Sequence, residues 1–532
     1  MHSPVLWRAD LVGPAPISGE TIGALLVRRG VALFWGLAGL GALVAVLASA
    51  IGFLTLPRDT VEGFLWGRSI AWGYFKHPPL QAWVLGLSEH VAPGAPWLAY
   101  VHAQICVLVT LWAVWALAVA VLGPAQGVVA AFLTLAGIHY YGPPMATFTP
   151  DTLSAPLWAL TGLFWWRAVV QGRSAAWFAL AVVVALSVYA KYVGLLLVAV
   201  LAVLTLTLPA GRAQMRRPVF WLALALGLAL VAPHVAWVVE TGGSSLAHIL
   251  STDATADTVL MRLWYCLCFF GAQVLAHAGL VALLAICVGA GAFRPAPELV
   301  IEGRDPGETE KTLLLVMAFA PILIAVVTNF AVGGEFRQGR GTALFAFSGI
   351  AALVLIGPRL VVGRLRLATI VVVAVVLVLP VVNAGHHVLR LAAGAAHVPT
   401  LYPARTLASE LESRWRQRTG RPLRIVAGDR WHAGNVAFYA AARPQILFDG
   451  DTRLSPWITA ERVAREGALL VWHPDDDAAR VRLERLVPSL TAEGSVHADA
   501  VLRHGAPTVL AFRIVPPLKP ADRGGQPGAA AP

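Results

Sequence analysis

The sequence predicts an all-α polytopic membrane domain followed by a small soluble α/β domain. Of the 532 residues, 58% are hydrophobic and only 13% are charged, and the mean hydropathy is +0.70. These values lie outside the range of ordinary soluble domains and are typical of chains that cross a bilayer repeatedly. The C-terminal part differs, because short β-type runs replace the long apolar segments there.

Apolar segments occupy most of the chain from residue 31 to residue 390. A helix needs roughly 20 apolar residues to cross the hydrocarbon core, and about eleven segments meet or approach that length. They lie near residues 31–53, 98–122, 126–141, 152–168, 175–190, 192–209, 218–238, 264–291, 312–332, 342–357 and 367–385. The first thirty residues carry Pro, Arg and Asp, so we expect the first span to remain as an anchor rather than to be cleaved.

Lysines and arginines indicate the orientation of the spans. With residues 1–30 in the cytoplasm, the cytoplasmic segments hold about twice as many of these residues as the opposite side. The positive-inside rule therefore favours a cytoplasmic N-terminus. An odd number of spans then exports the first loop, 54–97, and everything after residue 390.

Neither the net charge of +11 nor the four cysteines indicates another class of protein. The arginines fall in short bursts between apolar runs rather than on one basic face, so we expect no nucleic-acid partner. The cysteines lie in or beside apolar segments without zinc-site spacing, so we expect neither a disulfide framework nor a cysteine metal site.

Residues 400–516 are predicted to form the α/β domain. The runs LRIVAG, QILFD, ALLVW and TVLAFRIV have β-type composition, and segments 433–442, 458–466 and 477–487 between them have helical character. The Gly- and Pro-rich end, residues 517–532, is predicted to be a disordered tail.

The first exported loop places polar residues beside aromatic ones in LPRDTVEGFLWGRSIAWGYFKHPPL. Asp59 and Glu62 are three residues apart, so a helix would present them on one face. Burial raises the pKa of a carboxyl group toward the working range, which makes Asp59 a candidate general base. Lys76 and His77 are candidates for binding a phosphate. The alternative is that Asp59 caps an interfacial helix and that the tryptophans form an aromatic belt.

Two further polar sites are predicted within or at the ends of spans. Asp151 begins a span in TPDTL, where it could also be an ordinary helix start. Lys191 and Tyr192 interrupt a long apolar stretch in VYAKYVG. A lysine at a helix end can snorkel to the surface, but a charge in this place is a functional candidate by default.

Three arginines lie on the side that the charge rule expects to be poor in arginine. Arg337 and Arg340 precede a span in GGEFRQGRG, and Arg262 precedes another. Anchoring at the interface is one interpretation. The other is phosphate binding, because an arginine at a helix N-terminus is well placed for it.

These motifs together resemble the GT-C membrane glycosyltransferases. An acid in the first exported loop, the element GYFKHPPL, a second acid in TPDTL, the AKY junction and an exported tail follow one another as in that superfamily. Within it, the chain is similar to the group of protein O-mannosyltransferases and lipid A aminoarabinose transferases, and most to bacterial members that carry GY-x-KHPPL. The resemblance covers most of residues 31–390 and only loosely the tail.

The resemblance implies a glycosyltransferase of the bacterial inner membrane whose site and C-terminal domain face the periplasm. It would move a hexosyl or pentosyl group from a polyprenyl-phosphate donor to a hydroxyl of a glycolipid or glycan acceptor, such as lipopolysaccharide or lipid A. Asp59 matches the catalytic first-loop acid, and Asp151 matches the second acid. One-step displacement with Asp59 as base would invert the anomeric configuration. The expected substrate contacts are Tyr74, Lys76, His77, Lys191, Tyr192, Arg262, Arg337 and Arg340, with Glu62 as a further candidate acid.

Two departures from the family pattern concern the first loop. The family often has an acidic pair where this chain has Asp59-Thr60, with Glu62 displaced, and an acid where this chain has Lys76. Because that acid contributes to metal binding in some relatives, the sequence argues against a divalent ion without deciding the point. No cofactor and no metal ligand are assigned.

Other functions stay open at this stage. A proton-coupled transporter or lipid flippase would use the same acids as a proton relay, and a protein O-glycosyltransferase would differ only in its acceptor. The charged candidates lie in or beside exported loops rather than at mid-membrane, which favours the transferase. In a third interpretation the exported α/β domain is a binding module. Its segment AGDRWHAGN offers Asp429, Trp431, His432 and Asn435 at a strand-to-helix turn.

Overall fold

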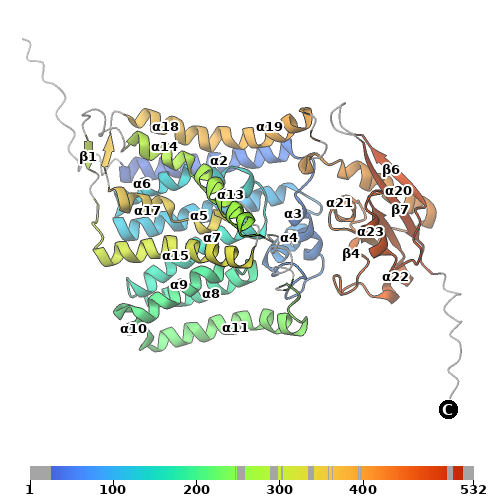
Figure 1. Ribbon diagram of the computed structural model, residues 1–532, viewed down its shortest axis with the longest axis horizontal. Helices are drawn as coiled ribbons and strands as arrows, with labels where there is room; N and C mark the ends of the chain where they lie inside the picture. Colours follow the sequence, from blue (N-terminus) through green and yellow to red (C-terminus); the bar gives the residue numbers. More distant parts are fainter. Residues whose placement is uncertain are drawn as a thin grey trace, which may run out of the picture.

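A computed structural model shows a bundle of long helices with an α/β domain beyond one end (Figure 1). This arrangement confirms the predicted fold class. The residues that the structure describes are 26–245, 247, 258–287, 298–300, 303–333, 341–357, 359–361, 364–393, 395, 398–499 and 507–518. Most of the predicted cytoplasmic N-terminal segment and nearly all of the predicted tail lie outside these residues.

Helices account for the membrane domain, apart from one short pair of antiparallel strands, β1 (Glu298–Val300) and β2 (Arg359–Val361). The helices are α2 (Val31–Gly52), α3 (Arg58–Gly67), α4 (Leu80–Val91), α5 (Trp97–Leu122), α6 (Pro124–Leu135), α7 (Pro150–Val169), α8 (Ser174–Ala190), α9 (Gly194–Thr207), α10 (Pro209–Met215), α11 (Pro218–Glu240), α13 (Val259–Ala276), α14 (Ala278–Cys287), α15 (Glu308–Val332), α16 (Gly341–Leu344), α17 (Ser348–Ile356), α18 (Leu365–Val373) and α19 (Leu379–Ala392). Short π- and 3-10 segments are Leu26–Gly30, Ile138–Tyr140, Pro143–Met145, Ala374–Val378 and Pro399–Leu401.

Every apolar segment predicted to cross the membrane contains helix. Within the described residues, 6 helices are long and apolar enough to span a bilayer by themselves, or 7 if α9 and α10, which meet at a 91° bend, count as one span. The figure of about eleven crossings and the cytoplasmic N-terminus stay predictions.

Two predicted spans have different limits in the structure. The segment 126–141 is α-helical only to Leu135, because Gly137 adopts an extended backbone (φ −63°, ψ 117°) and a short 3-10 turn, Ile138–Tyr140, follows it. The segment 264–291 is broken at His277, whose ring nitrogen Nδ1 bonds the carbonyl oxygen of Gln273 at 2.7 Å and whose Nε2 lies 3.1 Å from Ser348 Oγ. Neither interruption has a periodic signature that a hydropathy pattern could detect.

The centre of the membrane domain is built on α5 and α7. Both helices bury side chains on all sides, and the tryptophans Trp158, Trp165 and Trp166 of α7 are at most 1% exposed. A helix that is apolar around its whole circumference belongs inside a large protein or a membrane. By contrast, α11 and α13 bury few residues and expose large apolar side chains, which we expect to face lipid.

Helices α3 and α4, which belong to the first loop, 54–97, lie between the two domains (Figure 1). They come into backbone contact where Gly67 meets Gly86. A Cβ atom on either residue would come within 2.6 Å of backbone atoms of the other helix. Glycine is therefore required at both positions for the helices to pack.

The C-terminal domain contains a five-stranded sheet in the order β4-β3-β5-β7-β6. Strands β3, β4 and β5 are parallel, whereas β6 and β7 are antiparallel to their neighbours. The elements are α20 (Ala404–Thr419), β3 (Ile425–Gly428), α21 (His432–Tyr439), β4 (Gln445–Phe448), α22 (Ala460–Glu466), β5 (Ala468–Trp472), α23 (Asp477–Leu483), β6 (Gly494–Ala498) and β7 (Thr508–Val515).

All four β-type runs identified in the sequence form strands, whereas α20 and β6 were not predicted. Helix α20 has a signal that could have been found, because Leu407, Leu411 and Trp415 recur at helical spacing and are buried. Strand β6 has none, since its sequence GSVHA contains only short apolar side chains.

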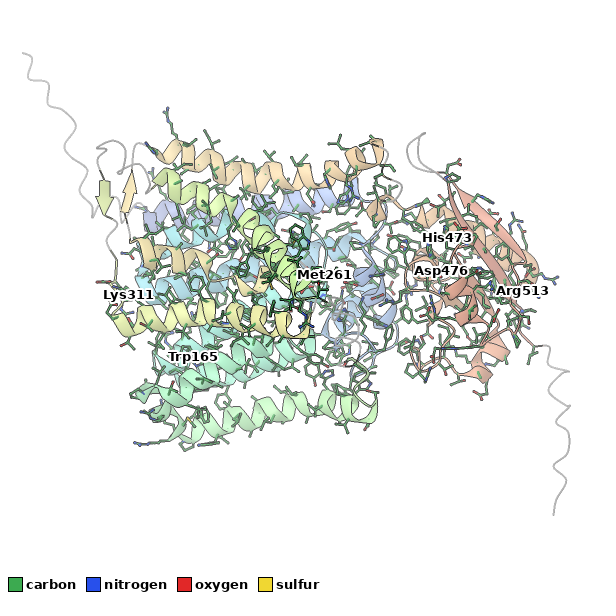
Figure 2. All side chains as sticks on the ribbon, viewed as in Figure 1. Trp165, Met261, Lys311, His473, Asp476 and Arg513 are labelled. Carbon is green, nitrogen blue, oxygen red and sulfur yellow. The ribbon has the colours of Figure 1, made fainter. Side chains whose placement is uncertain are left out.

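The α/β domain packs against α3 through α21. The rings of Phe64 and Phe438 lie 4.9 Å apart, and the Leu56 amide donates to the Tyr439 hydroxyl at 3.1 Å. Side chains fill the space between the two domains, and His473, which follows β5, lies nearer the membrane helices than Arg513 of β7 (Figure 2). Residues of both domains belong to one continuous apolar core. The domain is therefore a fixed part of the first-loop environment.

Candidate functional site

The first-loop cluster is centred on the ammonium group of Lys76. Its Nζ lies 2.6 Å from Asp59 Oδ1 and 2.7 Å from Glu62 Oε2. Pro57 ends the preceding extended segment, so Asp59 lies in the first turn of α3 and Glu62 follows one turn later on the same face. The segment 68–79 then folds back and brings Lys76 between the two carboxylates.

Burial differs sharply between the two acids. The Glu62 side chain is fully buried, whereas the Asp59 side chain is 40% exposed. Burial raises the pKa of Glu62 above its ordinary value, an effect that Lys76 opposes and Asp59 reinforces. Burial alone would also raise the pKa of Asp59, but the charges of Lys76 and His77 outweigh it and hold that pKa well below its usual range. Asp59 is therefore an accessible, ionised carboxylate.

Two side chains of the first loop, Gln81 and Thr60, connect it to the start of α7. Gln81 Nε2 donates to the backbone oxygens of Asp59, at 3.1 Å, and Phe148, at 3.0 Å. The Thr60 hydroxyl also donates to the Phe148 oxygen, at 3.3 Å. Because Phe148 lies three residues before Asp151, these bonds bring the two predicted acids to the same end of the bundle.

The second predicted acid is paired with a predicted cation. Lys191 Nζ lies 2.5 Å from Asp151 Oδ1, and both side chains are partly exposed. Thr149 caps α7 by accepting a hydrogen bond from the Thr152 amide, which places Asp151 in the first helical turn. Lys191 has an extended backbone (φ −169°, ψ 139°) and ends α8. The AKY motif is thus a break between two helices whose lysine points to Asp151.

Hydrogen bonds through His234 connect Tyr192 to the first loop. The Nδ1 atom of His234 lies 2.6 Å from the carbonyl oxygen of Trp72, so it must carry the proton. In the neutral ring Nε2 then accepts from the Tyr192 hydroxyl at 2.9 Å, and the Tyr192 oxygen accepts from Ser245 Oγ at 3.0 Å. His234 is not among the predicted site residues, although its isolated position in an apolar span is a signal that could have indicated it.

Five of the predicted residues therefore lie in a closed chain of contacts. Its first half runs from Asp59 through Gln81 and the start of α7 to Asp151 and Lys191. Its second half runs from Tyr192 through His234 to Trp72. Trp72 belongs to the segment that carries Lys76, and Lys76 contacts Asp59. Helix α3, which carries Asp59 and Glu62, lies at the end of the bundle that bears the α/β domain (Figure 1). We call this group, with Glu62, the polar cluster.

The other predicted substrate contacts have different surroundings. The Tyr74 ring stacks on Trp66 at 5.1 Å, and its hydroxyl lies 3.0 Å from two backbone oxygens, so it shapes the loop. The His77 ring is half-buried, with its centroid 6.2 Å from that of Trp66. Arg262 donates to the oxygens of Phe330 and Ala331 at the end of α15. Arg337 and Arg340 lie outside the described residues.

Sequence reasoning missed one cation beside the polar cluster. Arg430, from the turn between β3 and α21, has its Nε 3.7 Å from Glu62 Oε1. The two residues are far apart in the chain and in different domains, so no local pattern connects them.

No metal centre was found among the described parts of the chain, where no three His, Cys, Asp or Glu side chains are arranged to hold an ion. The two closest carboxylates of the first loop, Asp59 and Glu62, instead share the Lys76 ammonium. This arrangement supplies positive charge at the place where the family pattern has an acid.

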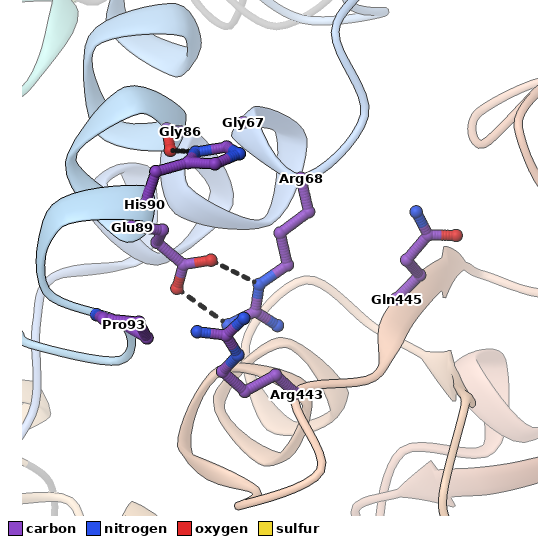
Figure 3. A pocket seen from close by; sticks show the side chains of 8 residues that line it. All are labelled: Gly67, Arg68, Gly86, Glu89, His90, Pro93, Arg443 and Gln445. Carbon is purple, nitrogen blue, oxygen red and sulfur yellow. Dashed lines mark hydrogen bonds and ion pairs between the residues drawn. The ribbon is translucent and has the colours of Figure 1, made fainter.

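A pocket of about 460 Å³ lies at the far end of α3 from Asp59. Figure 3 shows the Arg68 guanidinium facing the Glu89 carboxylate there, with Arg443 of the α/β domain beside them. Its lining residues are Gly67, Arg68, Gly86, Glu89, His90, Pro93, Arg443 and Gln445. This pocket is separate from the polar cluster and lies at the contact between the domains.

Comparisons with known proteins agree with this geometry. Residues 76–237 match the family model described as dolichyl-phosphate-mannose-protein mannosyltransferase. The solved structure of ArnT from Cupriavidus metallidurans bound to undecaprenyl phosphate superposes with a TM-score of 0.56 at 14% identity, covering 91% of this chain and 97% of that one. The apo structure of the same protein gives 0.54 at 15% identity, covering 90% and 98%. No curated protein matches the chain by sequence.

The matched stretch contains much of the polar cluster. Lys76, Asp151, Lys191, Tyr192 and His234 lie within it, whereas Asp59 and Glu62 precede it. The fold is shared over nearly the whole length of both chains. The resemblance to GT-C membrane glycosyltransferases is thus confirmed at the level of family motif and fold.

Proposed function

We propose that the chain transfers a sugar from a polyprenyl-phosphate donor to a hydroxyl of an envelope acceptor, a lipopolysaccharide or another surface glycan. The reaction would take place at the periplasmic face of the bacterial inner membrane. The observation that carries this proposal is the Lys76 ammonium held between Asp59 and Glu62 at one end of the membrane helices. The names of the matched family and of the undecaprenyl-phosphate complex support a lipid-phosphate donor.

The location of the polar cluster suits such a donor. A polyprenyl-phosphate sugar combines an apolar tail with a charged phosphate, so its head group can be presented only at a membrane surface. Helix α3, which carries Asp59 and Glu62, lies between the apolar bundle and the α/β domain (Figure 1). An enzyme there can keep the tail among apolar helices while Lys76 meets the phosphate.

The ion pair between Lys76 and Asp59 makes activation of the base depend on prior binding of the donor. While Lys76 is bound, the low pKa of Asp59 makes it a weak base. A donor phosphate that attracts Lys76 removes part of that stabilisation, and the pKa of Asp59 then rises. Donor binding would thus activate the base at the moment when it is required.

The bond changes follow from these positions. Asp59 takes the proton of the acceptor hydroxyl as the hydroxyl oxygen forms a bond to the anomeric carbon. The bond from that carbon to the phosphate oxygen breaks, and its electron pair stays on the phosphate. Lys76 stabilises the developing phosphate charge. A single displacement inverts the configuration, so a retained configuration in the product would contradict this mechanism.

The second ion pair, between Lys191 and Asp151, would also bind the donor. Lys191 and Asp151 are 2.5 Å apart and partly exposed, so either can exchange its partner for a substrate group. In this role Lys191 meets the phosphate and Asp151 meets sugar hydroxyls. Tyr192 and His234 fix the junction in place.

The test is transfer by the purified protein in liposomes. Synthetic polyprenyl-phosphate sugars are supplied with envelope glycolipid extracts, and release of polyprenyl phosphate is measured together with the product mass. Wild type should consume at least one donor, whereas Asp59→Asn should be about 10²-fold to 10⁴-fold slower. Glu410→Gln, on the exposed face of α20, is the control and should retain full activity. Donor that stays intact while a substrate crosses the vesicle membrane would indicate a transporter.

A further inference from the structure

The carboxyl edge of the α/β sheet carries charged residues toward the first loop. Asp429 and Arg430 follow β3, Asp449 follows β4 and His473 follows β5. In parallel sheets this edge is where ligands and functional groups gather. Helix α21, which begins two residues after Arg430, packs on α3, the helix of Asp59 and Glu62. The edge therefore adjoins the polar cluster.

Arg430 is placed on the open side of Glu62. Glu62 Oε2 is bonded to Lys76 at 2.7 Å, whereas Oε1 is buried and, among the described residues, accepts no hydrogen bond. Arg430 Nε lies 3.7 Å from that oxygen, with a side chain that is 30% exposed. A fully buried carboxylate oxygen without a hydrogen bond is costly unless a cation is near. Arg430 supplies that cation from the other domain.

The turn that carries Arg430 is fixed by its neighbours. Asp429 Oδ1 accepts from the backbone amides of Trp431, at 2.6 Å, and His432, at 2.7 Å, and its Oδ2 lies 3.0 Å from His432 Nδ1. Burial would raise the pKa of Asp429, but the bonds from His432 and Trp431 lower it overall, so Asp429 stays charged. Asn435 Nδ2 also donates to the Trp431 oxygen at 2.8 Å. The backbone of Arg430 therefore has little freedom.

We propose that Arg430 is a positioning residue of the transferase site, which keeps Glu62 ionised and thereby holds the Lys76 ammonium between Glu62 and Asp59. Two carboxylates and one ammonium leave a net negative charge, and the guanidinium balances it. Without Arg430, Glu62 would take up a proton more readily and release Lys76 from its central position. This inference rests on the proposed function and assigns the α/β domain a part in the chemistry.

The charged groups around Glu62 set the direction of the pH effect. Lys76 from the segment before α4, Asp59 from α3 and Arg430 from the α/β domain act on it directly. Arg58 and His77 lie beside Asp59, and Asp429 and Asp449 lie behind Arg430. Helix α4 contributes the neutral Gln81. The pKa of Glu62 is raised by burial and reduced in part by Arg430. Activity should therefore fall as the pH drops through this pKa, and removal of Arg430 should move that fall to higher pH.

The experiment measures kcat/KM against pH for wild type, Arg430→Gln, Arg430→Lys and the surface control Arg414→Gln. Arg430→Gln should lose roughly tenfold, or about 1.4 kcal/mol, which is within the range expected for residues in contact, and its acid limb should move to higher pH. Arg430→Lys should restore part of the activity, and Arg414→Gln, whose partner is the exposed Glu410, should match wild type. Matching thermal unfolding curves exclude a folding defect.

A double substitution separates positioning from direct substrate contact. On a Glu62→Gln background, Arg430→Gln should cause no further loss, because the carboxylate through which it acts is gone. Additive losses, or an Arg430→Gln enzyme with the kcat/KM and pH profile of wild type, would overturn the inference. A wild-type protein that transfers no sugar would instead contradict the proposed function, so the two failures are distinguishable.

Discussion

Arg68 and Glu89 form a two-point ion pair that also holds the two domains together. Arg68 Nε lies 2.8 Å from Glu89 Oε2, and Nη2 lies 2.9 Å from Oε1 (Figure 3). The remaining nitrogen, Nη1, donates to the backbone oxygens of Ala437 and Pro444 in the α/β domain. Both side chains are less than 10% exposed. One guanidinium thus connects the ends of α3 and α4 to the sheet domain.

Loss of this ion pair should loosen the α/β domain. Glu89→Gln leaves the buried Arg68 charge without its partner, which typically costs about 3–5 kcal/mol. We expect a lower unfolding temperature and faster cleavage between the domains in limited proteolysis. Arg414→Gln, which removes an exposed pair, is the control and should change neither. Equal proteolysis of wild type and Glu89→Gln would show that the pair does not secure the domain.

Lys76 should be required for donor use. Lys76→Met removes the only charge that bridges Asp59 and Glu62 within the described residues, and it leaves two carboxylates side by side. We expect kcat/KM for the donor to fall by about 10²-fold or more, because the cation that stabilises the leaving phosphate is lost. The matched control is Lys311→Met, since Lys311 pairs with Asp305 and Glu308 at the opposite end of the bundle (Figure 2). Comparable losses in both variants would assign Lys76 a general structural role.

The ion pair of Asp151 and Lys191 should behave as one unit. Asp151→Asn and Lys191→Met remove the same 2.5 Å contact, so their effects on activity should not add. Residues in contact couple by about 0.5–3 kcal/mol in a double-mutant cycle. The pair Arg304 and Glu310, at 2.6 Å in the other end of the bundle, tests whether any ion pair gives the same result. Additive losses at 151 and 191 would mean that the two side chains act separately.

Glu62 should make the stability depend on pH in a defined direction. Its pKa in the folded protein is above the ordinary value of 4.5, mainly because it is buried. A raised carboxyl pKa contributes stability below the unfolded value and loses it as the pH rises through the folded value. The unfolding temperature of Glu62→Gln relative to wild type should therefore increase from pH 4.5 toward neutral pH. A difference that stays constant over this interval would contradict the raised pKa.

The sequence predicted some contacts of the polar cluster, but not the position of Lys76 between the two acids. The spacing of Asp59 and Glu62 requires a shared helix face, and the lysine in AKY had to interrupt an apolar stretch. Both inferences depend only on local geometry. The place of Lys76 between two acids depends on the return path of segment 68–79, and no periodicity describes that path.

Contacts between the two domains could not be predicted from the sequence, for a different reason. Arg430 resembles any surface arginine in its own segment, and only the packing of α21 on α3 brings it to Glu62. The break at His277 was likewise hidden, because a histidine in an apolar run does not signal a bend until its hydrogen bonds are known. Periodicity predicted the elements, whereas tertiary packing decided how they meet.

The measurement that tests the central claim most directly is mass spectrometry of envelope glycolipids. Cells that lack this protein would be compared with cells restored with wild type or with Asp59→Asn at equal expression. We expect one sugar mass to vanish in the deletion, to return with wild type and to stay absent with Asp59→Asn. Full restoration by Asp59→Asn would show that Asp59 is not the base, and an unchanged glycolipid profile in the deletion would contradict a glycolipid-directed transferase altogether.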